Sequence, residues 1–325
     1  MTGAGGFIGR ALCARLASRG RAVTAVLRRP AQGPWDRVHV MELGVDPVVP
    51  SLFESVDTVY HLAARVHQTG ERPTDAHLHQ QTNVDATREL LEHATRANVR
   101  RFVFFSSIKA MGEFTDGCDD EDIVARPVTP YGKTKLAAEQ LVLAHGDDAS
   151  ERMQAVVLRL SVVYGAGSKG NVTSMLRQIR RGLFPPLPDF GNRRSMVHVD
   201  DVVDVALLAA QHANAGGGVF IVSDGVGYDT RTLYEVMCEA LGRPVPRWSV
   251  PVWVFRLAAS VGDLGGTIVR RRLPFNSAVF ATLRNSAHYS SQRLSTRLGF
   301  SAKFSLREGM VEMAASLDRH GGGKR

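Results

Sequence analysis

The chain opens with Thr2-Gly3-Ala4-Gly5-Gly6-Phe7-Ile8-Gly9, and this stretch decides the fold. Its glycines at positions 3, 6 and 9 stand at the mouth of a segment whose apolar residues recur at helical spacing. A loop without side chains lets backbone N–H groups approach a pyrophosphate, which then rests on the positive end of the helix. A lone glycine triplet would also suit a tight turn, so the prediction of a dinucleotide-binding loop depends on the pattern of the next segments of the chain.

Strand-like and helix-like segments alternate through the first half of the chain. Short apolar strands are expected at 22–27, 57–63, 102–105 and 155–160, with helices at 87–97 and 133–145. Such alternation implies right-handed crossovers and a parallel sheet with helices on both faces. The predicted fold class is α/β: a doubly wound parallel Rossmann sheet with a smaller C-terminal α/β substrate-binding region.

The character of the sequence changes after Tyr164, where proline and glycine become frequent. We expect a dinucleotide-binding Rossmann domain over 1–164, with a returning segment near 196–225. The substrate-binding region is expected over 165–195 and 226–318. The glycine-rich end, 319–325, is predicted to form a flexible tail.

Composition narrows the class of protein. The three cysteines include no CxxC pair, so we expect neither a disulfide framework nor a metal site. The net charge of +8 would suit a polyphosphorylated small substrate, an anionic membrane surface or nucleic acid. Because the basic residues are scattered, we expect no nucleic-acid partner. The chain lacks a run of roughly 18 apolar residues and a signal peptide, so we expect a cytoplasmic protein without membrane insertion.

A tyrosine and a lysine carry the strongest chemical signal. Tyr131 and Lys135 are four residues apart, which puts them on one face of a predicted helix. An adjacent ammonium favours phenolate and lowers the tyrosine pKa from about 10, which suits a general acid/base for hydroxyl–carbonyl interconversion. Ser107 follows the strand at 102–105, at the strand end where ligands bind in such sheets. Taken alone, Tyr131 and Lys135 could be a surface pair and Ser107 could be a turn or helix cap. The order of the three residues along the chain is what favours a shared chemical role.

In this order, the motifs resemble the extended short-chain dehydrogenase/reductase family, which comprises nucleotide-sugar epimerases, dehydratases and 4-ketoreductases. The resemblance covers nearly the whole chain, including HLAA at 61–64, NVDAT at 83–87 and VYGAG at 163–167. It implies that Ser107, Tyr131 and Lys135 are catalytic. The cofactor-binding residues that it implies are Gly3, Gly6, Phe7, Ile8, Gly9, Leu62, Ala63, Ala64, Asn83 and Lys135. The substrate-binding residues that it implies are Ser107, Asn171 and Arg194.

The resemblance also narrows the reaction. Ile108-Lys109 stands where the 4,6-dehydratases carry an Asp-Glu pair, so we do not expect dehydration. The stretch 106–113 is most similar to 4-ketoreductases and epimerases of UDP-linked N-acetyl-deoxyhexosamines. We therefore expect an NAD(P)-dependent oxidoreductase acting at C4 of a UDP-linked amino or deoxy sugar, first of all a 4-ketoreductase in surface polysaccharide biosynthesis. A UDP-glucose or UDP-N-acetylhexosamine-type 4-epimerase is the alternative, and a non-catalytic dinucleotide sensor is a third.

Charge favours one cofactor. A carboxylate at the end of the second strand would bind a ribose 2′-hydroxyl and repel a 2′-phosphate. The strand at 22–27 ends instead in Arg28-Arg29, with no acid beside them in the sequence. NADP(H) is therefore favoured, with Arg28 as a cofactor-binding residue, while NAD(H) and two solvated arginines stay open.

Two expectations concern the ends of the chain and its assembly. Only Met1 and Thr2 precede Gly3, whereas the first strand of such a sheet lies mid-sheet and spans about five residues. We therefore expect the natural protein to begin several residues upstream. The family resemblance implies a homodimer formed through two helices beside the active site.

Overall fold

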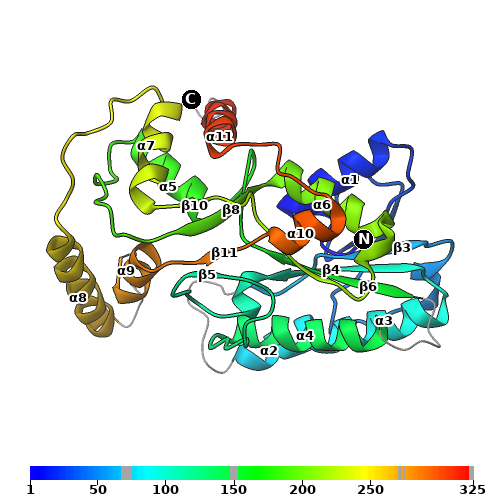
Figure 1. The fold of residues 1–325 in the computed structure, drawn as a ribbon. Helices are drawn as coiled ribbons and strands as arrows, with labels where there is room; N and C mark the ends of the chain where they lie inside the picture. The colour runs from blue at the N-terminus through cyan, green and yellow to red at the C-terminus, as the bar shows by residue number, and fades with distance from the viewer. Residues whose placement is uncertain (67–74, 147–152, 270–272, 274, 322–325) are drawn as a thin grey trace.

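The computed structural model describes residues 1–66, 75–146, 153–269, 273 and 275–321, and a parallel sheet lies at its centre (Figure 1). Four neighbouring strands of this sheet, in spatial order, are β3 (Thr58–His61), β4 (Arg101–Ser107), β6 (Gln154–Leu160) and β9 (Val219–Val222). β1 (Thr24–Leu27) pairs with β2 (Arg37–Val40). All these ladders are parallel, which confirms the predicted α/β class.

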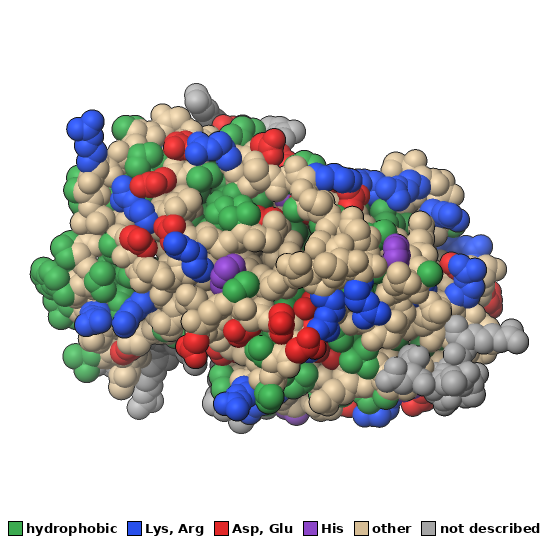
Figure 2. Space-filling model, in the orientation of Figure 1, with side chains coloured by type: hydrophobic (Ala, Val, Ile, Leu, Met, Phe, Trp, Pro, Cys, Tyr) green, Lys and Arg blue, Asp and Glu red, His purple; other side chains and the backbone are tan. Residues whose placement is uncertain are grey.

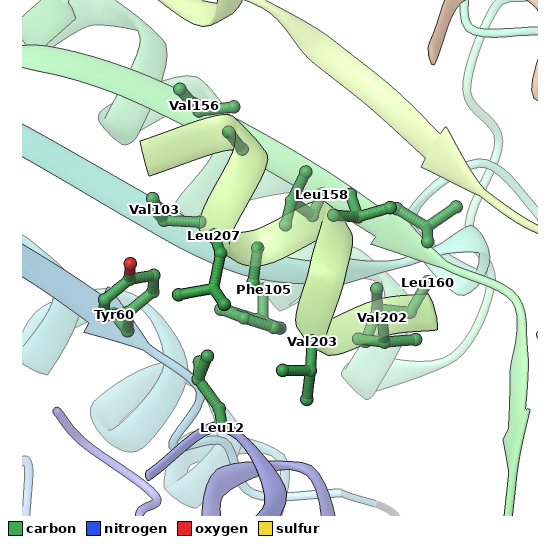
Figure 3. Packing of buried hydrophobic residues seen from close by; sticks show 14 of the residues in the cluster. Leu12, Tyr60, Val103, Phe105, Val156, Leu158, Leu160, Val202, Val203 and Leu207 are labelled. Atoms are coloured by element: carbon green, nitrogen blue, oxygen red, sulfur yellow. The ribbon is translucent and has the colours of Figure 1, made fainter. Parts of the chain in front are cut away.

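Helices cover both faces of the sheet (Figure 1). One face carries α1 (Phe7–Ser18), α6 (Val199–Gln211) and α10 (Gln292–Leu298); the other carries α2 (Ala76–Gln80), α3 (Ala86–Arg96) and α4 (Pro130–Gly146). Val103 and Phe105 of β4 pack with Leu12 and Val203 of the first set of helices (Figure 3). The alternate side chains of β4 pack with the second set. Burial on both faces explains why β4 reads as a continuous apolar run.

The remaining helices form a second region beside the sheet. They are α5 (Asn171–Arg180), α7 (Thr230–Ala240), α8 (Val252–Val269), α9 (Ser277–Arg284) and α11 (Leu306–Gly321). Their apolar side chains share one cluster, which includes Leu176, Met237, Phe255 and Met310. This region carries the sequence that was predicted to bind substrate.

Short strands and turns join the two regions. β7 (Val162–Tyr164), β8 (Arg194–His198) and β10 (Gly227–Tyr228) form a small sheet, and β5 (Cys118–Asp119) pairs with β11 (His288–Tyr289). The short helical turns are η1 (Pro50–Phe53), η3 (Gln81–Asp85), η4 (Ile108–Ala110) and η5 (Ala213–Ala215). Strands of two or three residues have no readable period, so the sequence did not predict them.

The chain crosses between the two regions more often than the predicted boundaries suggest. α10 lies within 226–318, yet its Leu294 and Leu298 pack in the core of the Rossmann sheet. α11 extends to Gly321, so residues 319–321 are helical where a flexible tail was expected. The helix continues because Met313 and Leu317 keep its apolar face buried up to its last turn. Residues 322–325 of the predicted tail lie outside the described part of the chain.

A cavity interrupts the sheet beside Met1. Thr2 bridges β1 at Val26 and β3 at His61, so it occupies the mid-sheet position expected for a first strand. On the amino side of Met1, a cavity of about 1340 Å³ separates the facing edges of β1 and β3. The Met1 ammonium donates to the Thr24 carbonyl at 2.6 Å, and burial lowers the pKa of this ammonium to about 6. Where the natural chain begins stays a prediction.

Candidate active site

The glycine loop is folded tightly against the end of β3. Gly3 has a φ of +68°, and a Cβ at this position would lie 2.8 Å from the Ala63 backbone nitrogen. A Cβ at Gly9 would lie 2.2 Å from the Gly3 carbonyl oxygen. α1 begins at Phe7 after Gly6, which has no side chain to cap it. The N–H groups of the first turn are therefore left for a ligand, and the loop fits a pyrophosphate.

A buried hydrogen-bonded chain fixes this loop to its neighbours. The Thr2 hydroxyl lies 2.6 Å from His61 Nδ1, and His61 Nε2 lies 2.8 Å from the Thr87 hydroxyl. Burial lowers the pKa of His61 to about 3, so the ring is neutral at physiological pH. Leu62, Ala63 and Ala64 follow directly and are half-buried beside the loop. The histidine thus positions the strand end predicted to line the cofactor.

Asn83 ties the loop after β3 to α4. It is buried in η3, a single π-helical turn, a feature frequent at functional sites. Its Oδ1 accepts from the Arg65 backbone N–H at 2.7 Å, and its Nδ2 donates to the Thr134 hydroxyl at 3.0 Å. These contacts make Asn83 a positioning residue, and its predicted contact with the cofactor stays a prediction.

The structure brings Ser107, Tyr131 and Lys135 together. Ser107 ends β4 and lies near enough to Tyr131, at the start of α4, to oppose the rise in the tyrosine pKa. A Cβ at Gly132 would lie 2.4 Å from the Lys109 carbonyl oxygen, so only glycine lets α4 pack so closely on the turn after Ser107. Lys135, one turn further along, is buried and donates from Nζ to the Phe105 carbonyl at 2.5 Å. A hydroxyl pair and a lysine thus meet at the carboxyl end of the sheet.

The predicted effect of Lys135 on Tyr131 is wrong. Burial raises the pKa of Tyr131, and Ser107 only partly opposes this. Burial lowers the pKa of Lys135 itself to about 7, partly offset by Glu139. Lys135 Nζ donates to the Phe105 carbonyl, and burial sets the direction in which the pKa of Tyr131 moves. The phenol of Tyr131 is therefore protonated at neutral pH, as a proton donor must be.

A buried ion pair lies behind the site, and it was not predicted from the sequence. Glu139 accepts a hydrogen bond from the Ser106 hydroxyl and forms an ion pair with Arg159 at 2.8 Å. Both charged side chains are buried, so the pair joins β4, β6 and α4. The sequence signal that could have indicated this pair is one charged residue within each of two apolar segments. These residues are Arg159 in the strand at 155–160 and Glu139, one turn after Lys135.

The arginines that were predicted to select the cofactor are exposed. Arg28 and Arg29 follow β1 directly. A third arginine, Arg10 of α1, donates to the Gln32 carbonyl at 3.1 Å and lies over the Trp35 ring. Positive charge therefore surrounds the loop after β1, where an adenosine ribose would bind in this fold.

The predicted substrate-binding residues lie in the second region. Asn171 is the exposed first residue of α5. Arg194 begins β8, is half-buried, and donates to the Thr282 carbonyl of α9. Burial lowers the pKa of Arg194. Within the described ranges, neither side chain bonds to Ser107, Tyr131 or Lys135, so their predicted roles depend on a ligand that spans the two regions.

The fold and this site define a dinucleotide-binding enzyme with a Ser-Tyr-Lys centre. The sequence profile described as "NAD dependent epimerase/dehydratase family" matches residues 1–223, and the chain belongs to this family. The predicted family resemblance is thereby confirmed. In the part of the chain that the structure describes, no group of three His, Cys, Asp or Glu residues could hold a metal ion.

Individual relatives agree with this assignment. The chain is 32% identical over 267 residues to a "UDP-glucose 4-epimerase" of Vibrio cholerae, covering 79% of this chain and 80% of the relative. It is 26% identical to a "4-hydroxy-2-methyl-3-oxo-4-farnesyl-3,4-dihydroquinoline-1-oxide ketoreductase" of Stigmatella aurantiaca. This match covers 95% of this chain and 93% of the relative. The solved structure "MoeE5 in complex with UDP-glucose and NAD" is similar with a TM-score of 0.76 and 29% identity, covering 99% and 98%.

The sequence also predicted where the protein is located and how it assembles. Among the described helices, none is long and apolar enough to cross a membrane. The cytoplasmic location and the homodimer stay predictions.

Proposed function

We propose that this enzyme oxidises or reduces C4 of a UDP-linked sugar with a nicotinamide cofactor. The observation that carries the proposal is the placement of Ser107 beside Tyr131, one helical turn from buried Lys135, at the carboxyl end of the sheet. The Vibrio cholerae relative is named for a UDP-sugar, and MoeE5 was solved with UDP-glucose and NAD. These names support the substrate class and the cofactor class.

Each residue has a stated role in this proposal. The glycine loop, Leu62 to Ala64 and Lys135 would hold the cofactor, which supplies hydride exchange at the sugar carbon when bound. Tyr131 gives a proton to the C4 oxygen or takes one from it, and Ser107 hydrogen-bonds the same oxygen. Asn171 and Arg194 would bind the nucleotide diphosphate, since a guanidinium suits such a group.

The first candidate reaction is 4-ketoreduction of an amino or deoxy sugar for surface polysaccharide. Burial raises the pKa of Tyr131, and reduction of a ketone requires a protonated donor. Exposed Arg28 and Arg29 favour NADPH, an exchangeable reductant. The second candidate is 4-epimerisation with retained NAD, favoured by the Vibrio cholerae relative and by the NAD in MoeE5.

The decisive experiment is to release and identify any dinucleotide carried by the purified protein. A reductase is expected to arrive empty and to oxidise added NADPH with a UDP-4-keto sugar. Retained NAD, together with C4 interconversion of a UDP-sugar without added cofactor, would identify an epimerase instead. Dinucleotide binding with neither turnover would overturn both candidates and support a sensor.

Cofactor choice has its own test. Arg28→Asp replaces an attraction for the 2′-phosphate by a repulsion, so NADPH affinity is expected to fall far more than NADH affinity. Arg88→Asp changes a similarly exposed arginine on α3 and serves as the matched control. Equal effects of Arg28→Asp on both cofactors would show that Arg28 does not select between them.

A further inference from the structure

The helix α8 lies at the outer edge of the molecule and has two apolar faces (Figure 1). Its inner face is fixed to the second region, where Phe255 and Ala259 are buried in the apolar cluster. A Cβ at Gly262 would lie 1.9 Å from the Phe275 carbonyl oxygen, so the backbones touch at this point. α8 is therefore anchored by one side only.

The outer face of α8 carries an apolar stripe open to solvent. Its members are spaced four, four and three residues apart along one side of the helix: Trp253, Leu257, Val261 and Leu264. They are between 58% and 66% exposed. Figure 2 shows hydrophobic side chains gathered over this edge of the molecule. A contiguous exposed stripe of this kind marks an interaction surface.

Three exposed arginines belong to α8 and to the segments next to it. Arg256 is exposed on α8, Arg247 precedes the helix, and Arg284 ends the neighbouring α9. Asp263 is the single acidic residue of α8, and its carboxylate accepts hydrogen bonds from Ser277 of α9, at 3.3 Å from the backbone nitrogen and 2.5 Å from the hydroxyl. Asp263 is thus held against α9, while the three exposed arginines belong to α8, to the segment before it and to the end of α9. The whole chain carries a net charge of +8.

Tryptophan adds a more specific signal. Trp253 lies in the stripe, and Trp248, just before the helix, is 63% exposed. Tryptophan is enriched where a protein meets the boundary between lipid and water, because its ring is apolar and its N–H is polar. A helix with Trp and Leu on its open face and arginine at its flanks matches a helix that lies in this boundary.

We propose that α8 docks this enzyme on an anionic lipid surface, with its stripe at the acyl boundary and its arginines at the headgroups. The helix is about 27 Å long, enough for its stripe to contact a flat surface along its length. α8 packs on α9, whose Thr282 carbonyl holds Arg194, so docking places the substrate-binding region beside the membrane. This surface function is additional to the proposed reaction and does not depend on it.

A second copy of the chain is a weaker occupant. A standard protein interface buries about 800 Å² on each partner. Four side chains on one helix supply less than this, and like-charged arginines would face one another in a symmetric pair. A lipid surface needs no matching protein face and offers the opposite charge.

Vesicle flotation tests the proposal without substrate. Its result is therefore independent of whether the proposed reaction is correct. The wild-type protein at low salt is expected to float with mixed phosphatidylglycerol–phosphatidylcholine vesicles, and much less with phosphatidylcholine alone. Leu257→Ser/Leu264→Ser should reduce the bound fraction at least tenfold. The control Val45→Ser/Val311→Ser removes two exposed valines elsewhere and should bind as the wild type does.

Three outcomes would overturn the proposal. Absence of wild-type binding to the anionic vesicles is the first. Equal binding by the α8 variant would mean that charge alone attracts the protein. A wild-type dimer in sedimentation that the α8 variant breaks would assign the stripe to a second copy. Melting temperature confirms that the variant is folded, and in a Trp35→Phe/Trp248→Phe background, which leaves Trp253 as the one tryptophan of the sequence, a blue shift of its fluorescence on vesicle addition gives an independent readout.

Discussion

The two regions of this enzyme hold their functional side chains in different ways. In the Rossmann region, His61, Asn83 and Lys135 are at most 2% exposed, and each makes hydrogen bonds within the protein. In the second region, Asn171 is exposed and Arg194 is half-buried against one backbone carbonyl. The side chains that position the loop and the start of α4 are therefore fixed within the protein, whereas the proposed substrate contacts would be completed by the substrate. Changes in the first region should alter turnover or stability, and changes in the second should alter substrate affinity.

The largest expected effect is a loss of turnover, and it comes from Tyr131→Phe in the Rossmann region. This variant removes the hydroxyl that lies beside Ser107 and would serve the C4 oxygen. Turnover is expected to fall on the order of 10²–10⁴-fold, while dinucleotide affinity stays nearly constant. Steady-state kinetics and dinucleotide titration measure both quantities. Near-normal turnover would remove Tyr131 from the proposed chemistry.

The next effect concerns the cavity beside Met1, where the otherwise well-packed Rossmann region is weakest. The Tyr60 carbonyl accepts from the Thr2 N–H at 3.1 Å, and Thr58 directs its backbone groups to the same side because these groups alternate along a strand. Five apolar β-branched residues added ahead of Met1 would pair with both edges. Several new hydrogen bonds at about 0.5–1.5 kcal/mol each should raise the melting temperature by roughly 5–10 °C.

The control for this extension is a Gly-Ser extension of equal length. It can reach the same cavity but has little strand preference and no apolar side chain to bury. It is expected to leave the melting temperature unchanged. Equal melting temperatures for the two extended proteins would show that a strand does not enter between β1 and β3.

The difference between local patterns and contacts decided by packing explains what could be predicted from the sequence. The glycine loop and the Tyr131–Lys135 spacing are local, so the backbone alone fixes how these residues are placed. The Glu139–Arg159 pair joins residues far apart in the chain, and no local pattern indicates such a partner. The pKa of Tyr131 was predicted in the wrong direction because burial, which the packing of distant segments decides, raises it. The open stripe on α8 was equally hidden, since the sequence does not show which apolar face is covered.

A smaller effect, confined to substrate affinity, is expected from Arg194→Ala. A lost hydrogen bond from a guanidinium to a diphosphate is worth about 1.5–3 kcal/mol, so the KM for a UDP-sugar should rise at least tenfold. Dinucleotide affinity and melting temperature should change little. Arg193→Ala alters the exposed neighbouring arginine and serves as the control. A fall in dinucleotide affinity instead would place Arg194 with the Rossmann region.

The last expected effect is a change in how stability depends on pH. Lys135 has a pKa of about 7 in the folded protein, against about 10.4 when unfolded. Between these values the unfolded chain binds a proton that the folded protein does not, so this group makes stability rise with pH from about 7 to 10. Lys135→Met removes that contribution, so the melting-temperature profile of the variant should climb less over this range than the wild-type profile does.

Only the slope is decisive in this comparison. Methionine also loses the hydrogen bond to the Phe105 carbonyl, which shifts the whole profile by an amount independent of pH. Lys133→Met changes an exposed lysine on the same helix and is expected to keep the wild-type slope. Parallel profiles for the wild type and Lys135→Met would mean that Lys135 stays fully charged in the folded protein. In that case its ammonium would be available to stabilise a Tyr131 phenolate, as the sequence predicted.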